Sequence, residues 1–285
     1  MTSSSHKLRA AILLAFAAAG LGTVSAPALA DGDATWTFPV NVGVVSDYIF
    51  RGQSQTWGKP ALQISAEADH VSGAYAGVAA SNVSDRWLPG ATVEIDLYGG
   101  YRGKIADTVG YDLGLIYYTY PGANWSDSVF AGFNDKNSLN TLEASVALNY
   151  EWLTLKTGTT LTEYFGWSTN NSPVNGGFAG DLSAGVTGST RYSPFAELNA
   201  AYEVAEGWTV NGQLGRQMIR NSKGLDITYF KAGVSKAFAE GWTVGASYSV
   251  SSQPNAYKNF LSLANGTSAS DIARSKFFVS INKAF

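Results

Sequence analysis

The chain contains 285 residues, no cysteine and a formal net charge of −3. Without cysteine it forms neither a disulfide framework nor a thiolate metal site, and the acidic balance argues against a nucleic-acid partner. Charged residues make up only 14% of the chain and aromatic residues 13%. A soluble domain has about 25% charged residues, so this composition is unlike that of an ordinary soluble domain.

Residues 1–30 have the organisation of a secretory signal peptide. Lys7 and Arg9 supply a positive start, an apolar run follows, and Ala28-Leu29-Ala30 forms a small-residue cleavage site. The alternative, an amino-terminal membrane anchor, is disfavoured because the run is shorter than the roughly 20 residues that a spanning helix needs. We therefore predict export through the periplasm. The mature chain would start at Asp31 with 17 bases and 22 acids, a net charge of about −5.

Apolar and polar residues alternate with period two along the mature chain, as they do in half-buried strands. In residues 92–98, Val93, Ile95 and Leu97 face one way and three polar residues face the other. A helix would mix these groups, because it brings positions three or four apart together. Twelve such segments predict strands over residues 36–48, 60–70, 73–83, 91–101, 109–120, 140–151, 153–163, 191–203, 207–217, 226–237, 241–251 and 275–285.

The connections between these segments are alternately short and long. Long ones are expected at roughly 49–59, 84–90, 121–139, 164–190, 218–225 and 252–274. A bacterial outer-membrane barrel has an even number of antiparallel strands, short periplasmic turns and longer outer loops. We therefore predict an all-β fold: residues 31–285 form one transmembrane antiparallel up-and-down β-barrel of about 12 strands. Ten or fourteen strands stay open, because the loops 164–190 and 252–274 can hide or lose a hairpin.

The two ends of this barrel carry distinct sequence signals. Its terminal strand, ending at Phe285, resembles that of bacterial outer-membrane proteins, which implies recognition by the barrel-assembly machinery. The sequence of residues 205–210 is repeated at residues 239–244. We interpret the interval between the two copies as one hairpin period of the barrel. An interfacial belt at the periplasmic side is predicted for Trp36, Trp152, Trp208 and Trp242. Loop packing or outer-leaflet anchoring, with a sugar-stacking site as the alternative, is predicted for Trp57, Trp87, Trp125 and Trp167.

In a barrel the apolar face meets lipid, so the polar positions of the strands line the interior. The acids assigned to the lumen are Glu67, Asp69, Glu94, Asp96, Asp112, Glu143 and Glu197, and the bases are Lys156, Lys231 and Lys276. Most acids lie on the second to sixth strands, and the bases lie on the seventh, tenth and twelfth. We predict an acidic wall facing a basic wall, whose field orients dipolar solutes. The alternative is that these charges pair across a filled interior without an open channel.

The most distinctive stretch of the chain is residues 46–56, Ser-Asp-Tyr-Ile-Phe-Arg-Gly-Gln-Ser-Gln-Thr. Asp47 and Arg51 are close enough in sequence to pair, and Gly52 permits a turn at positive φ. We predict that both charged residues line the pore. The segment is interpreted as a constriction or loop-locking element at the extracellular mouth. The alternative is a plain turn stabilised by that ion pair.

This stretch also carries a family resemblance. Together with residues 59–63, 70–77 and 81–83 it resembles the TorF family of porins, proteobacterial outer-membrane proteins also catalogued as Gcw-type proteins of unknown function. The strong match covers about residues 42–83, and Ala79-Ala80 stands where the family often has a larger residue. The resemblance implies a Gram-negative outer-membrane barrel with a transport role. It transfers no catalytic residue, cofactor or substrate.

We predict a porin-like channel for passive diffusion of small hydrophilic solutes, surrounded by outer-membrane lipids, without enzymatic activity, cofactor or metal site. A lipid-acting barrel enzyme is one alternative. His70 is the only histidine of the mature chain and hence the only base for a serine–histidine site. No ordered partner pattern surrounds it, so we interpret it as a turn residue. A closed barrel with adhesive or structural loops is another alternative. The loop acids Asp127 and Asp135 lack the ligand spacing of a calcium loop.

Overall fold

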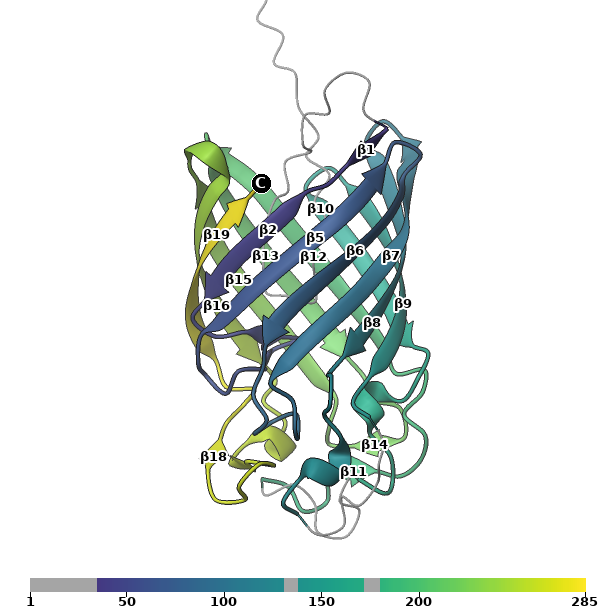
Figure 1. The fold of residues 1–285 in the computed structure, drawn as a ribbon, viewed down its shortest axis with the longest axis vertical. Helices are drawn as coiled ribbons and strands as arrows, with labels where there is room; N and C mark the ends of the chain where they lie inside the picture. Colours follow the sequence, from purple (N-terminus) through teal and green to yellow (C-terminus); the bar gives the residue numbers. More distant parts are fainter. Residues whose placement is uncertain (1–34, 131–137, 172–179) are drawn as a thin grey trace, which may run out of the picture.

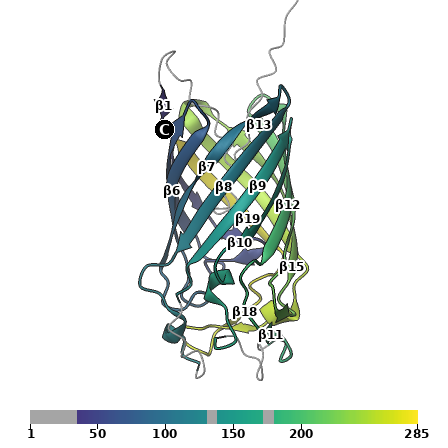
Figure 2. The same ribbon diagram turned by 90° about the vertical axis from the view of Figure 1, so that its right-hand side faces the viewer.

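Twelve long strands build one closed antiparallel wall in the computed structural model, which describes residues 35–130, 138–171 and 180–285 (Figures 1 and 2). The predicted signal peptide, residues 1–30, lies outside these residues. The wall strands are β2 (Val40–Val45), β5 (Ala61–His70), β6 (Ala74–Asn82), β7 (Val93–Ala106), β8 (Val109–Thr119), β9 (Thr141–Tyr150), β10 (Leu153–Thr160), β12 (Pro194–Ala205), β13 (Trp208–Gln217), β15 (Ile227–Ala237), β16 (Trp242–Ser251) and β19 (Lys276–Ala284).

Each wall strand pairs with its neighbours along the chain, and the last strand closes on the first. At this seam Ser280 of β19 lies opposite Val45 of β2, and Ala284 lies opposite Asn41. The short turns lie at the end that holds the C-terminus, here called the turn end; the long connections lie at the loop end (Figure 1). The predicted up-and-down barrel of twelve strands is confirmed. The repeat at residues 239–244 opens β16 as residues 205–210 open β13, one hairpin apart.

The first wall strand is shorter than the predicted 36–48. A short strand, β1 (Trp36–Thr37), pairs with β5 in the same register as β2, since Thr37 lies opposite Asp69 and Val40 opposite Ala66. Pro39 separates β1 from β2, because a proline has no backbone N–H to donate to the ladder. At the other end, Ser46 makes backbone and side-chain hydrogen bonds to Val279, and the chain then leaves the wall.

Strand β7 is longer than predicted. It continues to Ala106, five residues beyond the expected end, and the turn to β8 consists of Asp107 and Thr108. Arg102, expected in a turn, therefore lies on the wall directly opposite Asp112.

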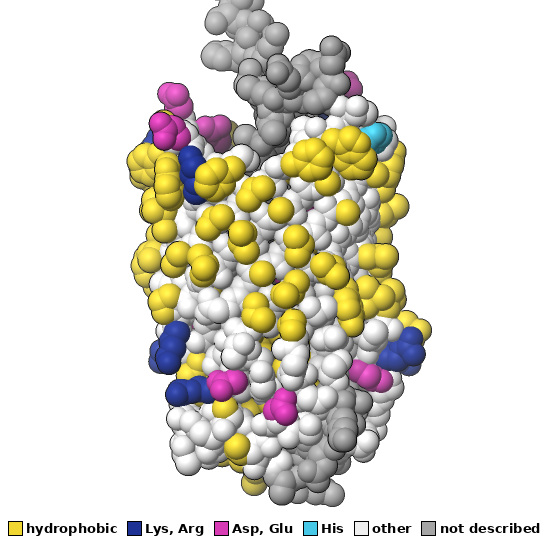
Figure 3. Space-filling model, viewed as in Figure 1, with side chains coloured by type: hydrophobic (Ala, Val, Ile, Leu, Met, Phe, Trp, Pro, Cys, Tyr) yellow, Lys and Arg dark blue, Asp and Glu magenta, His cyan; other side chains and the backbone are white. Residues whose placement is uncertain are grey.

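The two faces of the wall differ as the alternation predicts. On β5, Leu62 and Ile64 are 59% and 48% exposed, whereas the intervening Gln63 is 1% exposed. On β19 the outward Val279 and Ile281 are likewise exposed, and the inward Asn282 is buried. Figure 3 shows the outcome on one side: hydrophobic side chains spread over the wall, and charged side chains stay near its two ends.

The apolar core lies at the loop end, where the long connections pack over and into the barrel (Figure 2). Its buried members include Tyr48, Trp87, Trp125, Trp167 and Tyr257. Short elements order these connections: β3 (Ile49–Phe50), β4 (Gln53–Ser54), β11 (Gly185–Val186), β14 (Ser222–Lys223), β17 (Phe260–Leu261), β18 (Ala269–Ser270), η1 (Trp125–Asp127), η2 (Tyr164–Gly166) and η4 (Asn255–Tyr257). A further 3-10 turn, η3 (Ala239–Gly241), lies at the turn end.

The tryptophans divide as expected. Half-exposed indoles at the turn end belong to Trp36, Trp152, Trp208 and Trp242. Three of the loop tryptophans are buried, and Trp57 packs its ring 6.3 Å from that of Phe260. Loop packing is thus confirmed for these four.

No helix within the described part of the chain has the length and apolar character to cross a membrane.

Candidate functional site

The segment that follows β2 folds into the barrel. Residues 47–56 are all buried, and β3 and β4 pair as a minimal hairpin inside this segment. Its two-residue turn consists of Arg51 at φ 46° and Gly52 at φ 80°. Two successive positive φ values are typical of the type I′ hairpin turn. A Cβ on Gly52 would lie 2.8 Å from Cβ of Tyr229, so the hairpin tip packs directly against the wall.

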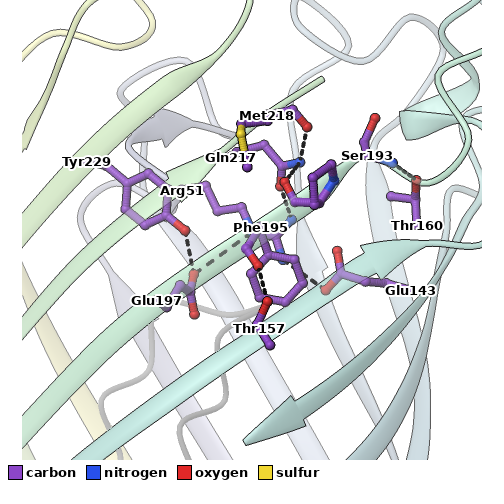
Figure 4. A network of polar contacts seen from close by, with 11 residues as sticks. Arg51, Glu143, Thr157, Thr160, Ser193, Phe195, Glu197, Gln217, Met218 and Tyr229 are labelled. Atoms are coloured by element: carbon purple, nitrogen blue, oxygen red, sulfur yellow. Dashed lines mark hydrogen bonds and ion pairs between the residues drawn. The ribbon is translucent and has the colours of Figure 1, made fainter. Parts of the chain in front are cut away.

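The turn places Arg51 among side chains from the far wall (Figure 4). Its Nη2 lies 2.8 Å from Oε1 of Glu143 on β9, and its Nη1 donates to Oε1 of Gln217 on β13 at 2.5 Å. Nε lies 3.9 Å from Oε1 of Glu197 on β12, and the guanidinium stacks 3.9 Å from the ring centre of Phe195. Four strands separate β2 from β9 around the wall one way, and three separate it from β13 the other way. Arg51 therefore braces the segment across the lumen.

Asp47 anchors the near end of the same segment. Its carboxylate accepts hydrogen bonds from Ser54 and Thr56 and lies 2.8 Å from Nζ of Lys276 on β19. Asp47 and Arg51 do not pair with each other, because the inward fold separates the two residues and gives each a partner on the wall. The alternative of a plain turn stabilised by that ion pair is therefore wrong, and the segment instead crosses the lumen.

Buried and half-buried carboxylates line the wall on strands β5 to β8. Glu94 accepts hydrogen bonds from the hydroxyls of Tyr48, at 2.7 Å, and Tyr120. Asp96, two residues along β7, is 3% exposed, and its Oδ1 has no hydrogen-bond partner among the described residues. Asp112 on β8 accepts from the hydroxyl of Tyr75 at 2.8 Å.

Basic side chains do not form a separate wall. Arg102 lies among the acids, with Nη2 2.7 Å from Glu67 and Nη1 3.4 Å from Asp69. Lys156 on β10 lies opposite Glu197 in the strand register, and Lys231 on β15 is partly buried. The predicted lysines lie on the strands expected for a basic wall. The segregation of charge is nevertheless incomplete, since Arg102 lies within the acidic wall and Lys276 pairs with Asp47, as expected when an unpaired buried charge is costly.

Several polar residues that contact the interior carboxylates were not predicted from the sequence. Arg102 was placed in a turn, although continuing the even-numbered alternation of β7 from Glu94 and Asp96 would have found it. The hydroxyls of Tyr48, Tyr75 and Tyr229 donate hydrogen bonds to carboxylates of the interior. No local sequence signal distinguishes such a tyrosine from one that faces lipid.

The candidate catalytic and metal-binding residues have local structural roles. The ring of His70 packs 4.6 Å from that of Trp36, and its Nδ1 lies 2.8 Å from Oγ of Ser72 within the same exposed turn. Asp127 caps η1, accepting from the backbone N–H of Asn124; Asp135 lies outside the described residues. Within the ranges that the structure describes, no group of three potential metal ligands is present.

A closed twelve-stranded wall with an apolar outside and a cross-braced polar inside defines a β-barrel of the porin-like, outer-membrane fold. The chain belongs to the Gcw_chp family, described as a bacterial protein of unknown function, whose profile matches residues 29–285. No curated protein matches the chain significantly in sequence.

Several solved structures of porins and outer-membrane channels are similar to this chain. The chain is similar to the KdgM porin in complex with disordered oligogalacturonate, at TM-score 0.50 and 7% identity over 87% of this chain and 99% of that one. The NanC porin matches at TM-score 0.48 and 11% identity over 87% and 99% of the two chains. An outer membrane channel from Pseudomonas putida F1 matches at TM-score 0.40 and 12% identity over 88% and 95%. At 7% identity, the first match shows a shared fold.

Proposed function

We propose that the protein is a porin-like outer-membrane channel for the passive diffusion of small hydrophilic solutes. The observation that carries the proposal is the polar inner face of a closed barrel whose outer face is apolar. Such a barrel is stable only in a membrane, and a lumen lined with hydrogen-bonding groups replaces part of a solute's hydration. The TorF resemblance supports the same role.

We infer that residues 1–30 direct export and that the turn end faces the periplasm of a Gram-negative cell, with the long loops outside. The half-exposed tryptophans at the turn end suit a headgroup boundary. The strand that ends at Phe285 would deliver the chain to the barrel-assembly machinery. It forms the closing seam with β2.

The interior charges suggest a preference for cations. The inward charges named above comprise eight acids and five bases among the described residues. No ion pair joins Glu94 or Asp96 to a described basic side chain. The segment of residues 47–56 narrows the lumen beside them, so a low conductance is expected.

Reconstitution of the purified barrel into liposomes tests the proposal against its alternatives. Size-dependent swelling in sugars and amino acids is expected, with protein-free liposomes as the control. Release of fatty acid from a labelled phospholipid would instead support a lipid-acting enzyme using His70 and Ser72. If the liposomes show no swelling and the phospholipid is not cleaved, the result would support a closed barrel whose loops serve adhesion or structure.

A further inference from the structure

The outer face of the barrel changes from apolar to cationic at the loop end of β12, β13 and β15. Leu198, Leu214 and Phe230 lie side by side on these three strands and are between 44% and 52% exposed. Two residues farther along β13, about 7 Å closer to the loops, the exposed residue is Arg216. The outer face of a membrane barrel is apolar where it meets acyl chains, so this change marks the edge of the hydrocarbon layer.

The same alternation continues beyond the last residue of β13. Met218 and Arg220 are exposed, and Ile219 between them is buried. The N–H of Met218 donates to the carbonyl of the first residue of β12 at 3.0 Å, which places the half-exposed Tyr192 at the same level. A half-exposed tyrosine is typical of the boundary between acyl chains and headgroups. Arg220 lies on the loop side of this boundary.

A second arginine is held beside Arg220. The hydroxyl of Ser193 accepts a hydrogen bond from the N–H of Arg220 at 3.0 Å and donates one to the carbonyl of Thr190 at 2.6 Å. Another hydrogen bond, of 2.7 Å, joins the next pair of residues along the two segments. Arg191, which follows Thr190, is exposed, and its Nε donates to the carbonyl of Leu161 at 3.1 Å. The two arginines therefore belong to one ordered part of the surface.

The charge of these two arginines is not neutralised within the protein. In the part of the chain that the structure describes, no ion pair joins Arg191 or Arg220 to a carboxylate, whereas Arg216 is paired. The carboxylate of Glu163, on the same connection, accepts its hydrogen bonds from a serine and a threonine. The guanidinium of Arg191 lies 5.4 Å from the ring centre of Tyr192. The surface thus presents two unpaired cations directly above an apolar face.

We propose that this surface, formed by Arg191, Tyr192, Met218 and Arg220, binds the phosphate-bearing headgroup of a membrane lipid. The guanidinium groups bind phosphate oxygens, for which their planar, forked donors are suited. The acyl chains of the lipid lie along the apolar outer face of β12, β13 and β15, which a free phosphate ion would leave uncovered. The inference concerns the outside of the barrel and goes beyond its role as a channel.

Native mass spectrometry of the full mature barrel in detergent tests this proposal, with diphosphoryl lipid A as the probe and monophosphoryl lipid A for comparison. The diphosphoryl form should bind more tightly. Arg191→Gln combined with Arg220→Gln should weaken its binding roughly 25-fold, about fivefold for each arginine. Lys104→Gln combined with Lys236→Gln removes the same charge at the turn end and is the matched control, for which wild-type binding is expected.

Equal binding of diphosphoryl lipid A by wild type and the double arginine variant would overturn the proposal. An equal loss in the lysine control would do the same, because it would show an effect of net charge alone. Equal binding of the two forms of lipid A would mean that only the acyl chains are recognised. Displacement of lipid A by an equal concentration of inorganic phosphate would overturn the assignment to a lipid and indicate a site for the free ion. If the double arginine variant does not fold, Arg220→Gln alone replaces it, with a loss of roughly fivefold expected.

Discussion

Arg51 combines a strained backbone with a buried charge. A residue other than glycine at φ 46° is uncommon, and a fully buried guanidinium is costly without partners. Glu143, Gln217 and the ring of Phe195 supply those partners. The contacts at the far wall therefore compensate both costs and hold the hairpin across the lumen.

Arg51→Ala removes this brace. We expect the free energy of unfolding to fall by about 3–5 kcal/mol, because Glu143 and Glu197 stay buried without their cation. Planar-bilayer recordings should show a higher conductance and a stronger preference for cations. The control is Arg216→Ala, whose ion pair with Asp226 is exposed and should change stability by at most about 1 kcal/mol. Reduced stability with unchanged conductance and selectivity would leave Arg51 a purely structural role.

The carboxylates on β7 bear on selectivity in the opposite direction. Glu94→Gln combined with Asp96→Asn removes two negative charges at nearly constant shape, and the amide that replaces the Glu94 carboxylate would still accept a hydrogen bond from a tyrosine hydroxyl. The reversal potential in a salt gradient should move toward zero, with the free energy of unfolding changed by only about 1 kcal/mol. Glu206→Gln combined with Glu240→Gln, at two exposed turns, removes the same charge and serves as the control. An unchanged reversal potential in the double variant would place these carboxylates outside the ion path.

Among the elements, the connection between β10 and β12 contains one carboxylate that accepts several hydrogen bonds. Glu163 accepts hydrogen bonds from the hydroxyl of Thr190 at 2.7 Å, from its N–H at 2.5 Å and from the hydroxyl of Ser189 at 2.7 Å. Partial burial opposes the charged form, but these hydrogen bonds outweigh it and hold the pKa of Glu163 below its ordinary value. The charged carboxylate thus ties the two ends of the connection together.

A lowered folded-state pKa has a defined consequence for pH. The stabilisation is fully present above the unfolded-state pKa of about 4.3 and is lost as the pH falls through the lower folded-state value. Hydrogen exchange at Tyr164 and Thr190, corrected for intrinsic rates, should therefore accelerate on acidification below about pH 4. In Glu163→Gln the exchange should already be faster at neutral pH and should change little with acid. Parallel pH profiles for the two proteins would contradict the assignment.

At the scale of the whole molecule, closure depends on the seam between the chain ends. Backbone hydrogen bonds join Phe285 and Val40 in both directions, at 2.9 and 3.5 Å, while the ring of Phe285 is 72% exposed. The ring therefore contributes little packing to the finished barrel, although the residue completes its last rung.

Phe285→Ala should consequently lower the yield of barrel in bacterial outer membranes while leaving refolding in detergent nearly unchanged. Heat-modifiable migration on gels measures both quantities. Phe285→Tyr keeps an aromatic terminus and should assemble normally. Equal loss of yield in membranes and in detergent would mean that the residue stabilises the barrel itself and does not direct its assembly.

The barrel was predictable from the sequence because its signal is local. The alternation of apolar and polar residues in β5 or β19 predicts which side chains face inward. The number of such segments predicts the number of strands in the wall. The end of β7 was missed because glycines and tyrosines weaken the alternation after Leu97. The inward fold of residues 47–56 was harder to predict, because a loop that extends away from a barrel and a loop that enters it have similar sequences.

The sequence by itself determined the closed wall, its even number of strands and the division into an apolar outside and a polar inside, because each follows from a period of two residues. Only the tertiary structure decided which charges meet. Arg51 reaches Glu143, 92 positions away, and Asp47 reaches Lys276, 229 positions away. Such pairs are favoured because burying a charge without a partner is costly. That cost arises only when the wall has closed around the segment.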